Sequence, residues 1–100
     1  MLTPDPVHDL VASHLGPGKH WTSCIFTDDD GTFLGLCVVG ASGVVDAAIT
    51  CHRLGINPGG QIVTEELPDY LLPSVKYRNR LLTREQVSEI WPEFYKESGL

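Results

Sequence analysis

This sequence of 100 residues lacks the features that mark several classes of protein. No apolar run approaches the roughly 20 residues needed to cross a bilayer. The N-terminus has no basic stretch followed by an apolar one, so we identify no signal peptide. The three cysteines are odd in number and form no C-x-x-C pair, which argues against a disulfide framework and a zinc knuckle. We therefore expect a cytoplasmic protein without a membrane partner.

Positive charge is also scarce, because thirteen acidic residues stand against seven lysines and arginines and give a formal net charge of −6. An acidic surface disfavours nucleic acid as a partner, since phosphate binding needs clustered basic side chains. The composition is otherwise that of a small soluble globular protein, with 42% hydrophobic and 20% charged residues. The length suits one domain, residues 1–100.

The order of the local patterns predicts an α+β domain with the element order α-β-β-α-β-(β)-α, in which helices pack on an antiparallel hairpin. Asp5 and Pro6 are typical of a helix start, and the apolar spacing after them predicts a helix over about residues 6–15. Residues 83–86 form a capping-box pattern before the last helix. The other predicted elements are strands over 20–27, 32–39 and 61–67 and helices over 44–54 and about 83–91.

The hairpin determines how the sheet must be packed. Asp30 and Gly31 supply the positive φ of a tight turn, and a two-residue loop there places Cys24 opposite Cys37. A four-residue loop would shift the register by two and keep the same faces. One face then carries Cys24, Phe26, Phe33, Cys37 and Val39, and the other carries Trp21, Ile25, Leu34, Leu36 and Val38. Because both faces are apolar, both must be covered. We expect a helix on one face and a second helix or a partner subunit on the other, which favours self-association.

A glycine-rich turn, Asn57-Pro58-Gly59-Gly60, separates the second predicted helix from the third strand. Glycine lets a backbone approach a ligand closely, so Asn57, Gly59 and Gly60 are candidate ligand-binding residues. The competing interpretation is a helix-to-strand turn that only needs positive φ values.

A basic stretch comes next, since four of the seven basic residues lie within nine positions, 76–84. Lys76, Arg78 and Arg80 are spaced by two, so on an edge strand or extended arm they would face one way. Three uses remain open. The first is ion pairing with acidic residues of its own chain. The second is contact with the acidic surface of a second subunit or another protein, and the third is binding of an anionic small molecule such as a nucleotide.

The cysteines and histidines predict neither a catalytic site nor a metal site. Cys51 and His52 are adjacent on a predicted helix, so their side chains diverge by about 100°. A zinc site would need two ligands beyond Cys24 and Cys37, and His20 is the only near candidate. We predict no cofactor.

Residues 46–66, whose centre reads HRLGINPGGQ over 52–61, resemble a motif in short uncharacterised bacterial and bacteriophage proteins. In those proteins a helix ends in Leu-Gly-x-Asn-Pro-Gly-Gly and a strand begins at once. Residues 79–85, NRLLTRE, are similar to the lead-in of their last helix. The resemblance implies an origin in a phage or mobile element, and it implies no activity, cofactor or catalytic residue.

Together these observations predict a non-enzymatic small binding protein that is homo-oligomeric. The first alternative is a counter-defence protein that sequesters an anionic nucleotide-like ligand, with Arg78, Arg80 and the turn at Gly59 and Gly60 as its site. The second alternative, an enzyme that depends on cysteine or histidine, is the weakest.

Overall fold

The computed structural model describes residue 15 and residues 17–93. The helix predicted over residues 6–15 lies outside this part of the chain except for its last residue. The described elements are β1 (His20–Thr27), β2 (Phe33–Ala41), α2 (Val44–Arg53), β3 (Gln61–Glu66), the 3-10 turns η1 (Asp69–Leu71) and η2 (Val75–Tyr77), and α3 (Arg84–Ile90). An α+β domain with a three-stranded antiparallel sheet is thereby confirmed.

Strand β1 is the central strand of the sheet, whose order is β2-β1-β3. It pairs antiparallel with both neighbours. Cys24 lies opposite Cys37, as predicted, but the two-residue loop at Asp30 and Gly31 is not formed: the loop is residues 28–32, and a bulge in β2 restores the register. The hairpin turn is closed by the side chain of Asp28, whose Oδ1 accepts hydrogen bonds from the backbone N–H groups of Asp30 and Thr32.

A β-bulge near the turn corrects the predicted faces of two residues. Phe26 pairs with Gly35 and Thr27 pairs with Phe33, so Leu34 is an extra residue in β2. One inserted residue exchanges the faces of the side chains beyond it. Leu34 therefore packs with the cysteines, and Phe33 packs on the opposite face.

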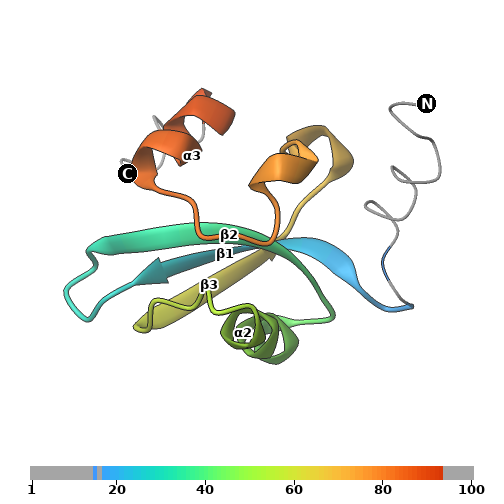
Figure 1. The fold of residues 1–100 in the computed structure, drawn as a ribbon, viewed down its shortest axis with the longest axis horizontal. Coiled ribbons are helices and arrows are strands. Elements are labelled where there is room, and N and C mark those ends of the chain that lie inside the picture. Colours follow the sequence, from blue (N-terminus) through green and yellow to red (C-terminus); the bar gives the residue numbers. More distant parts are fainter. Residues whose placement is uncertain (1–14, 16, 94–100) are drawn as a thin grey trace.

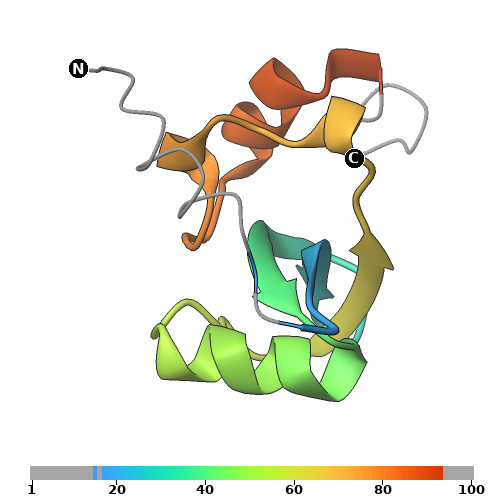
Figure 2. The same ribbon diagram turned by 90° about the vertical axis from the view of Figure 1, so that its right-hand side faces the viewer.

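Each face of the sheet is covered by a different part of the chain (Figure 1). Helix α2 lies along one face, and the segment 68–93, with η1, η2 and α3, lies over the other (Figure 2). The core on the α2 side comprises Cys24, Phe26, Cys37, Val39, Ala41, Ala47 and Cys51, and the core on the other side comprises Leu36, Val38, Leu82, Val87 and Trp91. The second face is thus covered within one chain and does not require a partner subunit.

The segment 75–81 does not form the predicted edge strand or extended arm. Residues 75–77 make the 3-10 turn η2, and Asn79 adopts a left-handed conformation with φ 61°. This turn brings the fully buried Leu82 against β2, where the backbones of Leu36 and Leu82 exchange hydrogen bonds of 2.7 and 3.2 Å. Asn79 N also donates to Val38 O at 2.9 Å. Burial of Leu82 thus overrides the alternating pattern, and the outer edge of β2 is closed here.

The last helix begins as predicted. The Thr83 side chain accepts a hydrogen bond from the backbone N–H of Gln86, and the Gln86 side chain accepts one from the backbone N–H of Thr83. Trp91 comes directly after the helix, and its Nε1 donates to Leu71 O at 2.7 Å. The helix and the η1 turn are therefore joined above the sheet.

Leu82→Ala should lower the free energy of unfolding by about 2–5 kcal/mol, because it leaves a cavity in a core that also contains Leu36 and Val38. Denaturant unfolding followed by tryptophan fluorescence measures the change. The matched control is Leu54→Ala at the end of α2, where 47% of the residue is exposed and the loss should stay below about 1 kcal/mol. Equal losses in the two variants would contradict a sealing role for Leu82.

Candidate functional site

The glycine-rich turn is positioned by contacts within the chain. The Asn57 side chain accepts a hydrogen bond from Gly59 N at 2.7 Å, and Gly59 and Gly60 have φ values of 95° and 75°. A Cβ added to Gly60 would overlap the carbonyl oxygen of Thr27, whereas one added to Gly59 would meet no atom within 4 Å. The close approach that Gly60 permits is therefore to β1 of the same chain.

The three basic residues do not form one stripe. Lys76 and Arg80 are exposed, and Lys76 Nζ lies 5.0 Å from the ring centroid of Tyr77. Arg78 is half-buried, with its guanidinium 4.8 Å from the ring centroid of Trp21 and its Nε donating to Pro73 O at 3.0 Å. Burial lowers the pKa of Arg78. Arg78 therefore ties the segment after η1 to β1.

The structure does not bring the glycine turn and Arg78 together. Arg78 stacks on Trp21 near the start of β1, whereas Gly60 contacts Thr27 at its end. Six residues along a strand span about 20 Å, so the two groups lie at opposite ends of the sheet. Asn57, Gly59 and Gly60 do not share a wall with Arg78.

Three thiols that the sequence leaves apart meet in the core between α2 and the sheet. Cys24, Cys37 and Cys51 are each 0% exposed, and their Sγ atoms all lie within 4.8 Å of one another. The Sγ atoms of Cys37 and Cys51 are 3.1 Å apart. The sequence contains information that predicts this cluster. The hairpin register places Cys24 and Cys37 on one face of the sheet, and the helix period places Cys51 on the apolar face of the helix that packs there.

The environment of this thiol cluster favours packing over chemistry. Burial raises the pKa of Cys51 to about 11, and a hydrogen bond to Cys24 together with burial raises the pKa of Cys37. The hydrogen bond with Cys37 lowers the pKa of Cys24. The neighbours are apolar, and among the described residues no fourth side chain completes a tetrahedral zinc site. His20 is exposed and lies 3.4 Å from Glu66. Fully buried thiols with apolar neighbours pack as small apolar side chains.

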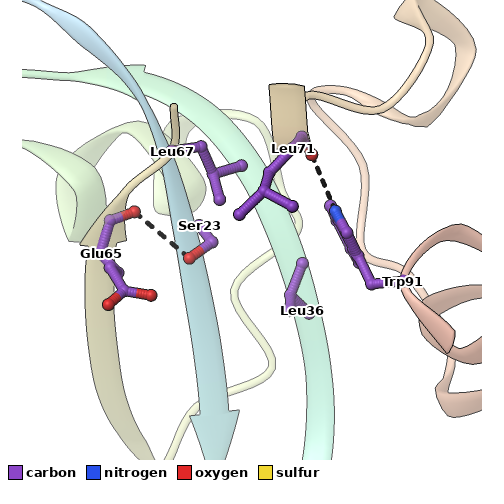
Figure 3. A pocket seen from close by; sticks show the side chains of 6 residues that line it. All are labelled: Ser23, Leu36, Glu65, Leu67, Leu71 and Trp91. Carbon is purple, nitrogen blue, oxygen red and sulfur yellow. Dashed lines mark hydrogen bonds between the residues drawn. The ribbon is translucent and has the colours of Figure 1, made fainter. Parts of the chain in front are cut away.

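A small cavity of about 50 Å³ lies on the other side of the sheet (Figure 3). Two of its polar groups are paired, since Ser23 Oγ donates to Glu65 O at 3.2 Å and Trp91 Nε1 donates to Leu71 O. The remaining lining is Leu36, Leu67 and Leu71. The cavity has room for a small alkyl group, and Glu65 is the charged residue of its lining.

The outer edge of β3 is the one strand edge of the sheet that no described segment covers (Figure 2). Leu67 N donates to Trp21 O at 2.8 Å, so by antiparallel alternation the odd-numbered residues of β3 bond to β1. The even-numbered residues Ile62, Thr64 and Glu66 then direct their N–H and C=O groups outward. Val63 is 63% exposed on this strand. The sequence predicts the strand but not its place in the sheet.

No known protein family, curated protein or solved structure matches this chain. The resemblance to short phage and bacterial proteins therefore stays a prediction. None of the helices in the described part of the chain is long and apolar enough to cross a membrane. Function is therefore inferred from the geometry of the fold.

Gly60→Ala should destabilise the protein by about 2 kcal/mol or more, because the methyl group adds a backbone overlap to the cost of a positive φ. Gly59→Ala is the matched control, since it adds only the backbone cost, about 1–2 kcal/mol. Thermal and denaturant unfolding measure both. Equal effects would contradict the contact between Gly60 and Thr27.

The thiol cluster predicts that a disulfide reagent such as DTNB labels none of the three cysteines of the folded protein at pH 8. All three should react in denaturant, because access requires unfolding. Ser74→Cys is the control, since residue 74 is exposed and should label at once. Fast labelling of a native cysteine would reveal an open route and restore the enzyme alternative.

Proposed function

We propose that this protein is a non-enzymatic binding protein that accepts an extended segment of a polypeptide along the outer edge of β3. The observation that carries the proposal is this strand edge, which no described segment covers and on which Ile62, Thr64 and Glu66 direct their backbone groups outward. Addition of a strand to an exposed edge is a recurrent mode of peptide recognition. Each backbone hydrogen bond gained would contribute about 0.5–1.5 kcal/mol.

The side chains of β3 define the chemistry of the segment. Val63 is exposed on the face that carries segment 68–93, and Ile62 packs partly into the core on the α2 face. Glu65 and Glu66 are exposed at the carboxyl end of the strand. A segment with small apolar side chains at its centre, and without acidic residues opposite Glu65, is therefore preferred.

Binding is favoured over catalysis because the three thiols and Arg78 are used inside the fold. The thiols are sealed in the core, and Arg78 is stacked on Trp21. The separation of Arg78 from Gly60 means that these two residues do not share the site that the nucleotide-sequestering alternative needs.

A short synthetic peptide tests the proposal. The probe is a capped octapeptide of alternating valine and threonine with a lysine at each end, added to dilute ¹⁵N-labelled protein. We expect amide shifts at Ile62, Thr64 and Glu66, with a dissociation constant of about 1 mM or below. Thr64→Pro, which removes one outward N–H, should abolish these shifts. Val45→Lys on α2, at a valine 70% exposed, should leave them unchanged.

Shifts confined to the cavity beside Trp91, or no shifts at all, would refute binding at this edge. A melting curve of Thr64→Pro establishes that the variant is folded. If it is not, Val63→Lys replaces it, because a lysine in an edge strand blocks pairing without removing a hydrogen bond to β1.

A further inference from the structure

We infer that the segment accepted by β3 is β3 of a second copy of this chain, in the antiparallel register that places Val63 opposite the partner's Val63. This inference rests on the proposed function, since it names the partner of the same edge. The doubly apolar hairpin does not supply the contact between copies, because its second face is covered by segment 68–93.

The symmetry limits the registers. A two-fold axis normal to the sheet makes the two strands antiparallel and keeps each face on the same side. Opposed residues must then come from the same face, and the outward-bonding residues must meet each other. Every register centred on one residue satisfies both conditions, and those centred on Ile62, Val63 or Thr64 pair the longest part of the strand.

Side-chain chemistry selects the register centred on Val63. There the two Val63 side chains form a non-hydrogen-bonded pair, in which side chains approach most closely, and Gln61 lies opposite the partner's Glu65. Ile62 and the partner's Thr64 exchange backbone hydrogen bonds. The Gln61 amide can donate to the carboxylate opposite it.

The two other registers are less favourable. Centring on Thr64 places Val63 opposite the partner's Glu65 and Ile62 opposite the partner's Glu66, so acidic groups are set against apolar ones. Centring on Ile62 requires Gly60 to continue the strand, but its φ of 75° is not extended.

The net charge of −6 does not oppose this arrangement at close range. In the register centred on Val63, the two Glu65 residues are separated by four residue steps along the strand, about 14 Å. This exceeds the Debye length of about 8 Å at physiological ionic strength, so their repulsion is largely screened. The product is one continuous sheet with α2 of both copies on the same face.

Disulfide trapping tests the register. Val63→Cys, oxidised with oxidised glutathione, should give a covalent dimer, because residues of a non-hydrogen-bonded pair lie near disulfide geometry. The two protein thiols form the S–S bond, and the oxidised glutathione is reduced to two thiols. Wild type and Val45→Cys should stay monomeric on a non-reducing gel. A mixture of Gln61→Cys and Glu65→Cys should cross-link, whereas Val63→Cys mixed with Glu65→Cys should give no mixed dimer.

Sedimentation equilibrium tests the partner. Wild type and Val45→Lys should dimerise, and Val63→Lys should raise the dimer dissociation constant by about tenfold or more, because two lysines would oppose each other. A monomeric wild type that still binds the peptide would refute the second copy but leave the proposed function standing. A monomer without peptide binding would refute both. A dimer trapped through Val63 and Glu65 would refute the register.

Discussion

A hairpin whose two faces are both apolar cannot be exposed to water on either side, and most of this structure is a consequence of that constraint. Helix α2 satisfies it on one face through Ala47 and Cys51. The segment 68–93 satisfies it on the other, although it contains only short helical pieces. Three specific contacts hold this segment in place: the Leu36–Leu82 bridge, the stacking of Arg78 on Trp21 and the Trp91–Leu71 hydrogen bond.

The strands and helices between residues 20 and 91 can be predicted from the sequence because the patterns that specify them are local. The Asp-Gly sequence marks the hairpin turn between β1 and β2, and a capping box sets the start of α3. The bulge at Leu34 leaves no such signal, since Phe33 and Leu34 are both apolar and either fits either face. Basic and uncharged residues do alternate over 75–81, and this pattern favours an extended strand. Burial of Leu82 is the stronger effect, and the left-handed conformation of Asn79 turns the chain so that Leu82 reaches the core.

The candidate residues show a different limit of sequence reasoning. Arg78 and Gly60 are residue types that occur in ligand sites, but here each makes a contact within the fold. Arg78 stacks on Trp21, and Gly60 lies against the Thr27 carbonyl. A local sequence pattern does not give the distance between residues that are far apart in the chain. It therefore could not predict that these two residues lie about 20 Å apart, at the two ends of β1. The open edge of β3 is missed for the same reason, since strand order is a property of the assembled sheet.

The two outer strands of the sheet are treated differently, and this difference bears on function. Proteins commonly protect an exposed edge with lysine, proline, a bulge or a covering segment. The edge of β2 receives a covering segment at Leu82 and Asn79. Strand β3 has neither lysine nor proline between Gln61 and Glu66, its pairing with β1 is regular, and its two acidic residues lie at one end. An edge that is regular and exposes Val63 at its centre is suited to pairing, and its acidic end restricts which strands pair with it.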